Sequence, residues 1–393
     1  MTGKNFREEG TTMKKSYLAA AAILGAGIFA GQAHAAKIDL GDGKSFIFGF
    51  RGKINATYKA KRDNDDKADL VLGVPDTRIY AKGSISKIFK WGWQAELTRN
   101  AGANPEIIDA FVLLDFAKEF KLMAGAYKLP FQLNSGIYMG WSLLMPVGIG
   151  SVLDVRDVAN NNNNPFANPA RDRMPRSGSR SPQITAWGKV ADGLFKYYLT
   201  LVDGTDEDPG AGVETKTGYG VRVEFAPVMA GYKGHPGYTL KETYLGKQNT
   251  LALGLSYFTQ KNGNATNKSL GVDLMWEQNL GAVTPNLQIG YVDHKDFRGV
   301  QDNDIKGLLF QGQVLFNQKT MLGKPAITVR WAQADPGTNN INSGYKASTL
   351  GVAGQLYVKG VGNRISLAVD QVKNDDPNVK DYTDITLALW YFF

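Results

Sequence analysis

The sequence contains no cysteine among its 393 residues, and it has only three histidines. Without cysteine the chain can form neither a disulfide framework nor a thiolate metal site. His235 and His294 lie in the body of the chain, and no motif around either supplies the nucleophile, base and orienting group of a hydrolase. We therefore expect no enzymatic activity, no cofactor and no dedicated metal site.

Long apolar runs are also missing beyond residue 35, so no segment there reaches the roughly 18 apolar residues of a membrane-spanning helix. A shorter run at residues 17–30 follows two lysines and precedes an Ala-His-Ala triplet. This order is typical of a secretory signal peptide, whereas a retained membrane anchor would need a longer run. We predict that residues 1–35 are a signal peptide, that 1–12 lie upstream of the true start at Met13, and that 36–393 form one exported domain.

The exported part shows apolar and polar residues in alternation, which places them on opposite faces of a β-strand. In the first such segment Phe46, Phe48 and Phe50 point one way, whereas Arg51 and Lys53 point the other way. Sixteen segments are predicted to be strands, near residues 46–59, 76–86, 91–99, 107–116, 121–129, 183–190, 194–202, 217–226, 250–260, 268–278, 284–295, 305–317, 324–334, 346–359, 362–372 and 382–393.

The connections between these segments alternate between short turns and longer polar loops, such as 61–75 and 203–216. The connection at 227–249 is an exception, because it is long where a short turn is expected. An even number of strands with such connections is typical of bacterial outer-membrane barrels. The sequence therefore predicts an all-β fold, a transmembrane antiparallel β-barrel of about sixteen strands.

The chain ends on the stretch ITLALWYFF, which stays apolar to its last residue. Phe393, Tyr391 and Leu389 share one face, as expected of a lipid-facing strand whose edge pairs with the first strand. In a soluble β-protein such an edge would promote aggregation. The ending resembles the signal by which outer-membrane proteins are handed to their assembly machinery. We also expect Trp390 and Phe392 to complete an aromatic girdle at the lipid interface.

A connection of about fifty residues separates the fifth and sixth predicted strands, which is far longer than usual. It is the third external loop by this count, and its small apolar stretch at 139–150 is suited to folding into the pore. Arginine makes fixed, bidentate contacts with oxyanions, and this loop contains Arg156, Arg171, Arg173, Arg176 and Arg180. The alternative is a solvated loop whose arginines bind the phosphates of lipopolysaccharide.

The predicted inner wall carries more bases than acids. The bases that the alternation points inward are Arg51, Lys53, Lys59, Arg78, Lys82, Lys128, Lys189, Arg222, Arg330 and Arg364, and the acids are Glu96, Asp109, Asp115, Glu224, Asp273, Glu277 and Asp370. Rings of arginine or lysine favour anions, and a narrow cleft focuses a small excess of charge. We predict anion selectivity from the five loop arginines together with Arg51, Lys53, Arg78 and Lys82. The dispersed bases give no support for a nucleic-acid partner.

Several segments resemble the phosphate-selective porin O/P family. They are KLMAGAYKLP (121–130) with Phe131 after it, and the segments 182–206, 242–258 and 271–292. The resemblance implies a sixteen-stranded outer-membrane channel, commonly a homotrimer, whose pore is narrowed by the third external loop. The dense basic run that this family carries along one strand is absent here, so the resemblance implies a broader preference for small anions and oxyanions such as phosphate.

Two further functions stay open from the sequence. One is a general, non-selective porin. The other is a barrel that serves as a sheath for an electron-transfer partner such as a multihaem cytochrome, although a sheath should lack a loop that occludes its lumen.

The first testable prediction concerns processing. If residues 1–35 are a signal peptide, protein purified from outer membranes should begin at Ala36 or one residue later, which N-terminal sequencing or intact mass would establish. A mature protein that starts at Met1 or Met13 would contradict the prediction.

Overall fold

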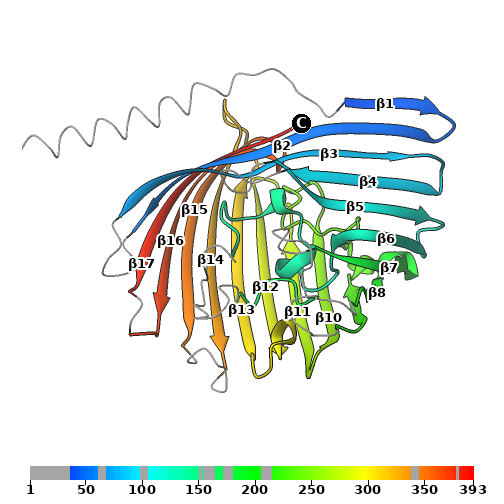
Figure 1. Cartoon of the computed structure of the whole chain (residues 1–393). Helices are drawn as coiled ribbons and strands as arrows, with labels where there is room; N and C mark the ends of the chain where they lie inside the picture. The colour runs from blue at the N-terminus through cyan, green and yellow to red at the C-terminus, as the bar shows by residue number, and fades with distance from the viewer. Residues whose placement is uncertain are drawn as a thin grey trace, which may run out of the picture.

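Sixteen antiparallel strands, β2 to β17, form a closed barrel in the computed structural model (Figure 1). The structure describes residues 36–60, 68–97, 105–149, 153, 164–170, 180–204, 215–337, 345–377 and 380–393. Each strand pairs with the next one along the chain, and β17 pairs with β2. No helix within these ranges is long and apolar enough to cross a bilayer.

The strands of the barrel are β2 (Lys44–Lys59), β3 (Asp69–Ser84), β4 (Phe89–Glu96), β5 (Glu106–Asp115), β6 (Lys121–Lys128), β7 (Arg180–Val190), β8 (Phe195–Val202), β9 (Gly218–Phe225), β10 (Thr250–Asn262), β11 (Ala265–Glu277), β12 (Val283–Lys295), β13 (Ile305–Phe316), β14 (Lys324–Pro336), β15 (Ala347–Lys359), β16 (Asn363–Asn374) and β17 (Tyr382–Phe392). A short strand, β1 (Ala36–Gly41), precedes them and pairs with the first part of β2.

Burial alternates along the strands because successive side chains point to opposite faces of the sheet. In β8, Leu199 and Leu201 are 52% and 49% exposed on the outer face, whereas Tyr198 is fully buried on the inner face. The same pattern continues on the strands of the opposite wall, where Ile327 and Val329 of β14 are exposed. An apolar outer surface of this kind suits contact with lipid.

Each of the sixteen predicted segments overlaps one strand, so the prediction of an all-β barrel is confirmed. One boundary was wrong: β3 begins at Asp69, inside the segment 61–75 that was expected to be a loop, because residues 69–73 extend the pairing with β2. The sequence analysis also missed β1. This strand has only six residues and is joined to β2 by a tight turn in which Asp42 has a positive φ of 51°.

Closure of the barrel depends on the C-terminal residues. Residues 385–392 of β17 pair with β2, and Phe393 exchanges two backbone hydrogen bonds with Phe50 (2.8 and 2.9 Å). Tyr391 and Phe393 both lie against the Phe50 ring, with ring centroids 5.6 and 5.5 Å away. The shared face predicted for Tyr391 and Phe393 is therefore present on the strand that closes the barrel.

Trp390 and Phe392 do not complete an outer aromatic girdle, so that expectation was wrong. Trp390 is only 8% exposed, and the ammonium group of the inward-facing Lys53 lies 4.8 Å from its ring centroid. Phe392 packs against Trp141 at 5.5 Å between ring centroids. Both side chains point inward because they alternate with Tyr391 and Phe393 on a regular strand.

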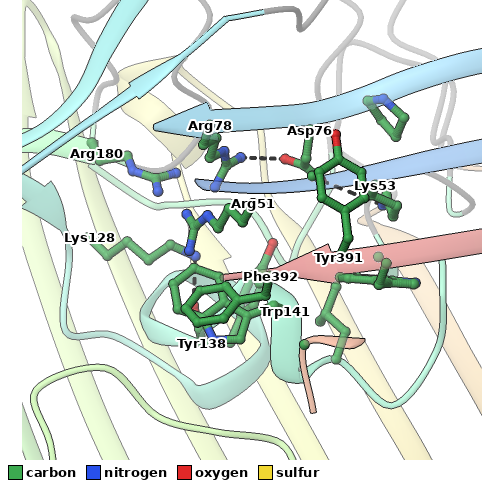
Figure 2. A pocket seen from close by; sticks show the side chains of 17 residues that line it. Arg51, Lys53, Asp76, Arg78, Lys128, Tyr138, Trp141, Arg180, Tyr391 and Phe392 are labelled. Carbon is green, nitrogen blue, oxygen red and sulfur yellow. Dashed lines mark hydrogen bonds and ion pairs between the residues drawn. The ribbon is translucent and has the colours of Figure 1, made fainter. Parts of the chain in front are cut away.

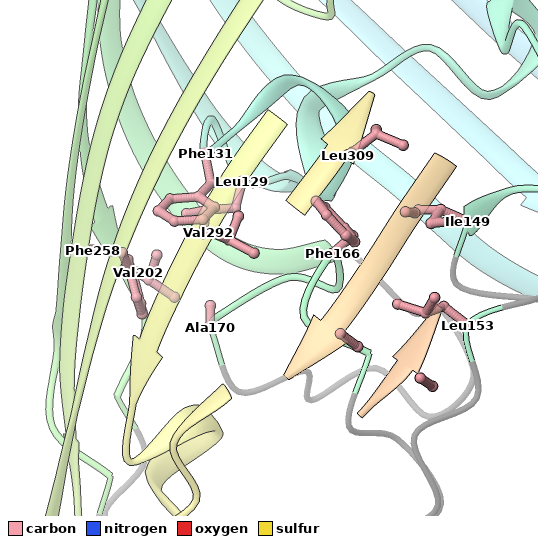
Figure 3. Close-up of a cluster of buried hydrophobic side chains, with 13 residues drawn as sticks. Leu129, Phe131, Ile149, Leu153, Phe166, Ala170, Val202, Phe258, Val292 and Leu309 are labelled. Carbon is pink, nitrogen blue, oxygen red and sulfur yellow. The ribbon is translucent and has the colours of Figure 1, made fainter. Parts of the chain in front are cut away.

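Described parts of two connections of the chain pack against the inner wall of the barrel. Described residues of the β6–β7 connection, including Leu129, Phe131 and Phe166, form a buried cluster with inward side chains of β8 to β15, such as Phe258 and Val292 (Figure 3). The β9–β10 connection, residues 226–249, contributes Leu240 and Tyr244 to a second buried cluster. The core of this molecule therefore lies inside the barrel, between the inner wall and these two segments.

The second prediction follows from barrel closure. Deletion of residues 391–393 removes the last pairs with β2 and both hydrogen bonds to Phe50, so we expect it to abolish membrane insertion and the faster migration of unboiled protein in detergent gels. Phe393→Leu keeps the backbone pairing and is the matched control, which should still insert. Normal insertion of the truncated chain would show that these residues are not needed for assembly.

Candidate functional site

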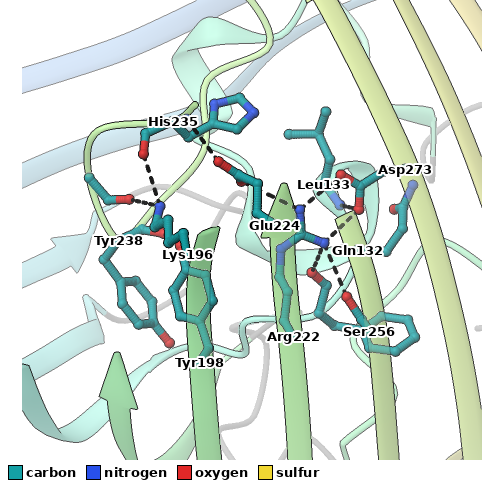
Figure 4. Close-up of polar contacts among 12 residues, drawn as sticks. Gln132, Leu133, Lys196, Tyr198, Arg222, Glu224, His235, Tyr238, Ser256 and Asp273 are labelled. Atoms are coloured by element: carbon teal, nitrogen blue, oxygen red, sulfur yellow. Dashed lines mark hydrogen bonds and ion pairs between the residues drawn. The ribbon is translucent and has the colours of Figure 1, made fainter. Parts of the chain in front are cut away.

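The β6–β7 connection is fixed to the inner wall by a buried ion pair (Figure 4). Arg222 on β9 donates to Asp273 on β11 through two nitrogens (2.6 and 2.8 Å), and one of them also donates to the carbonyl oxygen of Phe131 (3.1 Å). Asp273 in turn accepts a hydrogen bond from the backbone N–H of Leu133 (3.1 Å), at the start of the single-turn helix η1 (Leu133–Ile137). The wall therefore determines where this connection begins its course through the lumen.

The far end of the same stretch is held in a similar way. Arg330 on β14 pairs with Asp370 on β16 (2.8 Å) and donates to the carbonyl oxygen of Val147 (2.7 Å). Lys53 on β2 donates to the carbonyl oxygen of Pro146 (3.3 Å). Backbone carbonyls of a loop accept hydrogen bonds that buried cations would otherwise leave unmade.

The β9–β10 connection meets the β6–β7 connection inside the barrel. Because consecutive strands run in opposite directions, the two connections begin at opposite ends of the barrel. Tyr138 and Leu240 form a parallel bridge there, and the N–H of Met139 donates to the carbonyl oxygen of Leu240 (2.7 Å). The two segments therefore support each other across the lumen.

Glu242 is the main polar contact of this junction. Its carboxylate accepts hydrogen bonds from Leu144 N–H (2.8 Å), Gln311 Nε2 (3.0 Å) and Asn134 Nδ2 (3.2 Å). Burial raises the pKa of Glu242, and these three donors oppose the shift. The junction thus places one carboxylate where both segments and the β13 wall meet.

His235 is buried at the start of the β9–β10 connection (Figure 4). Its N–H donates to Glu224 (2.9 Å), its ring nitrogen Nδ1 lies 2.7 Å from the Tyr244 hydroxyl, and its carbonyl oxygen accepts from Lys196 (3.2 Å). Burial lowers the pKa of His235 to about 4; the charges of Lys196 and Arg222 act in the same direction, and that of Glu224 opposes them. The imidazole is therefore held in its neutral form.

Basic side chains gather in a cavity of about 300 Å³ between the wall and the β6–β7 connection (Figure 2). Its lining includes Arg51 and Lys53 of β2, Arg78 of β3, Lys128 at the end of β6 and Arg180 at the start of β7. Figure 2 shows the charged ends of Arg51, Arg78, Lys128 and Arg180 pointing toward one another. Tyr138 and Trp141 from the connection form the opposite side.

Carboxylates neutralise only some of these bases. Arg78 pairs with Asp76 and with Glu96 (both 2.5 Å), and Arg180 Nε donates to Asp109 (2.9 Å). These contacts hold the two guanidinium groups in place and cancel much of their charge.

Arg51 and Lys128 have no carboxylate within ion-pair distance among the described residues. Arg51 donates to the side chain of Gln94 and lies over the Trp141 ring, 3.5 Å from its centroid. Its Nη1 is buried without a hydrogen-bond partner in the described part of the chain. Lys128 donates to the carbonyl oxygen of Tyr138 (2.7 Å). An uncompensated guanidinium nitrogen beside a cavity can donate to an anion.

The structure brings four of the predicted selectivity residues together, namely Arg51, Lys53, Arg78 and Arg180. Lys82, further along β3, is exposed and does not line the cavity. The other four loop arginines, Arg156, Arg171, Arg173 and Arg176, lie outside the described residues.

Sequence reasoning named Lys128 only as an inward base, and it gave no role to Tyr138 or Trp141. The alternation along β6 was the available signal for Lys128. Nothing in the local sequence shows which strand Trp141 faces, because its partners Arg51 and Phe392 lie far away in the chain.

No family model matches the sequence, but the barrel is similar in fold to several solved structures. It is similar to an anion-selective porin from Comamonas acidovorans, with a TM-score of 0.61 and 15% identity over 89% of this chain and 100% of that one. It is also similar to the outer membrane channel DcaP of Acinetobacter baumannii (TM-score 0.54, 12% identity, 91% of this chain and 100% of that one). The fold is that of an outer-membrane porin.

Two further matches are a structure with lower similarity and a sequence match over about half of this chain. The trimer form of OmpT, an outer membrane protein of Vibrio cholerae, shares the porin fold with a TM-score of 0.51 and 7% identity over 90% of this chain and 100% of that one. An uncharacterized protein of Aquifex aeolicus (strain VF5) is 25% identical over 235 residues. That match covers 54% of this chain and 54% of the relative, so the chain spans about half the length of the relative that it matches.

The third prediction concerns pH. The ordinary pKa of histidine is about 6.5 and that of His235 is about 4, so its neutral form stabilises the fold above pH 6.5, and this contribution is lost as pH falls toward 4. The loss corresponds to about 3 kcal/mol of the free energy of unfolding. His235→Gln should therefore lose less stability than the wild type between pH 7 and pH 4, as measured by urea unfolding of the barrel in detergent.

Tyr244→Phe is the control for this experiment. It removes the hydroxyl partner but keeps the buried imidazole, so it should retain the acid sensitivity of the wild type. Equal acid sensitivity in His235→Gln and the wild type would contradict the assignment.

Proposed function

We propose that this protein is a passive outer-membrane channel for small solutes and that it prefers anions and oxyanions, such as phosphate. The observation that carries the proposal is the cavity in which Arg51 and Lys128 face the lumen without carboxylate partners in the described part of the chain. Fixed positive charge at a narrow point raises the local concentration of anions and lowers that of cations.

The balance of charge around this cavity supports the preference for anions. Five bases line it or its immediate edge, whereas the acids that contact them are Asp76, Glu96 and Asp109. The surrounding strands and loop segments reduce the screening of these charges by water. Three of the five bases are arginines, whose planar group matches the geometry of carboxylate and phosphate oxygens.

The similarity to porins supports the channel, and the porin from Comamonas acidovorans is anion-selective. Phosphate is a narrower proposal, which rests on the sequence resemblance and on the arginines. The proposed channel has no enzymatic activity and lies in the bacterial outer membrane after removal of residues 1–35. A homotrimer, bound lipopolysaccharide and recognition by the assembly machinery remain proposals as well, the first supported by the trimer form of OmpT.

A sheath for an electron-transfer partner is less consistent with the interior of the barrel. The described parts of the β6–β7 and β9–β10 connections occupy the lumen and bury Phe131, Leu240 and Glu242 against the wall. A protein partner would have to displace both segments. Whether the whole β6–β7 connection narrows the pore, and whether Arg156, Arg171, Arg173 and Arg176 act there, stays a prediction.

The fourth prediction tests the preference for anions. Arg51→Gln combined with Lys128→Gln should lower the permeability of chloride relative to potassium, measured from single-channel reversal potentials in a salt gradient. An interaction of about 1 kcal/mol per charge near 4 Å in water corresponds to about a fivefold effect. The change should be larger at low ionic strength, because salt screens exposed charges.

Lys82→Gln is the control for each of these two changes, because it removes one positive charge from the same wall outside the cavity. It should change the permeability of chloride relative to potassium much less than the double variant does.

A second variant with Arg171, Arg173, Arg176 and Arg180 all changed to Ala tests the loop. If the reversal potential of the Arg51 and Lys128 double variant equals that of the wild type, the cavity does not set selectivity. If the wild type prefers potassium, the proposed function itself is wrong.

A further inference from the structure

A second cavity of about 300 Å³ adjoins the basic cavity. The two share Arg51, Arg78, Lys128 and Arg180, together with Tyr138 and Trp141. They are therefore two chambers of one space, with the four cationic groups at the boundary between them. Each volume lies at the lower end of the range of about 300 to 1,000 Å³ in which proteins bind small molecules.

The second chamber is lined mainly by apolar and aromatic side chains. Leu113 of β5, Met123 of β6 and Trp187 of β7 line it from the wall, and Tyr238 of the β9–β10 connection lines it from the lumen. Contact between water and apolar side chains is unfavourable, so a wall of this composition is not suited to a chamber that holds only water. Its composition instead suits the apolar body of a solute.

Two tyrosine rings of this chamber are held in place by hydrogen bonds from their hydroxyls to backbone carbonyls. The Tyr127 hydroxyl donates to the carbonyl oxygen of Met123 (2.7 Å), and the Tyr238 hydroxyl donates to that of Lys128 (2.9 Å). The Tyr238 ring meets the rings of Tyr127 and Trp187 edge to face, with centroids 5.4 and 5.7 Å apart. Preorganised rings bind a flat apolar group at little entropic cost.

Three buried donors that line this space have no hydrogen-bond partner among the described residues. They are Arg51 Nη1 at the boundary of the chambers, the indole Nε1 of Trp187 in the apolar chamber and the indole Nε1 of Trp390 in the basic chamber. Buried donors of this kind are rare in folded proteins, because each costs the free energy of its lost hydration. A bound carboxylate at the boundary would supply the missing acceptor for Arg51.

We propose that the joined chambers bind aryl carboxylates. The carboxylate group lies between Arg51 and Lys128, and the aromatic ring enters the chamber of Leu113, Met123 and Tyr238. This proposal rests on the proposed anion channel and gives its solute class: organic anions with a flat apolar body are preferred over acetate, which has the same head group and charge but no ring.

The test measures how strongly benzoate and acetate block the chloride current of the wild-type channel in planar bilayers at pH 7.5. Both probes are fully ionised monovalent carboxylates at this pH, so a difference between them reports the ring. We expect half-maximal block at a benzoate concentration at least tenfold lower than that of acetate. Inorganic phosphate serves as a third probe. Because it has no ring, it should not show the tenfold lower blocking concentration expected of benzoate.

Two variants locate the effect. Leu113→Asn keeps the size of the side chain but makes the apolar chamber polar, so it should bring the benzoate and acetate values close together. Leu280→Asn makes the same change in the exposed turn between β11 and β12 and should leave the ratio as in the wild type. Arg51→Gln should weaken the block by both carboxylates, because both use the same head-group contact.

The outcomes separate this inference from the proposed function. A channel that prefers anions but is blocked equally by benzoate and acetate overturns the aryl carboxylate site and leaves the anion channel standing. A benzoate preference that survives in Leu113→Asn overturns the location. A wild-type channel that prefers cations overturns the proposed function and the site with it. The comparison of the probes on the wild type needs no variant, so it holds even if Leu113→Asn fails to fold.

Discussion

Hydrogen bonds from inward-facing cations to backbone carbonyls of the lumen segments are the interaction on which the interior depends. Arg222 donates to Phe131 and Arg330 to Val147, while each also pairs with a carboxylate of the wall. A buried guanidinium needs both kinds of partner, because an ion pair alone leaves several of its donors unsatisfied. The β6–β7 connection supplies an acceptor to each guanidinium, and its stretch 129–149 is thereby fixed near both ends.

These contacts reduce the number of inward bases that are available to a solute. A count of inward bases treats every one of them as available to a solute, but Arg222 and Arg330 each pair with a wall carboxylate and donate to a backbone carbonyl of the β6–β7 connection. Of the five bases around the cavity, Arg51 and Lys128 have an amide, an aromatic ring and a carbonyl oxygen as partners, with no carboxylate at ion-pair distance among the described residues. We therefore expect the proposed anion selectivity to depend on which bases lack carboxylates, not on their number.

Much of the fold could be predicted from the sequence, because the signal for a barrel strand is local. A period of two places Leu199 and Leu201 on one face and Tyr198 on the other without knowledge of any partner strand. The same rule would also have pointed Trp390 inward. The expectation of an outer girdle came from the aromatic composition of the last residues, which predicts the orientation of a side chain less well than alternation does. The six residues of β1 were too few to show a period.

The candidate site could be predicted only in part, since its two halves are joined by contacts between distant segments. Alternation identified Arg51 and Arg78 as inward bases, but the aromatic side chains that face them come from connections with no period. Trp141 reaches Arg51 only because the β6–β7 connection is anchored elsewhere, and Tyr238 reaches the wall only because 226–249 turns into the barrel. Such placement depends on the closed sheet as a whole, which no window of sequence contains.

The meeting of the two connections makes the site dependent on both ends of the barrel. Tyr138, which contacts Lys128, is also bridged to Leu240 of the segment that enters from the opposite end. Glu242 then ties this segment to Leu144 and to the β13 wall. A displacement of either connection must therefore move Tyr138, whose ring centroid lies 3.8 Å from the Lys128 ammonium group and whose carbonyl oxygen accepts its hydrogen bond. The geometry of the cavity is a property of the junction, and a change far from any solute contact can alter it.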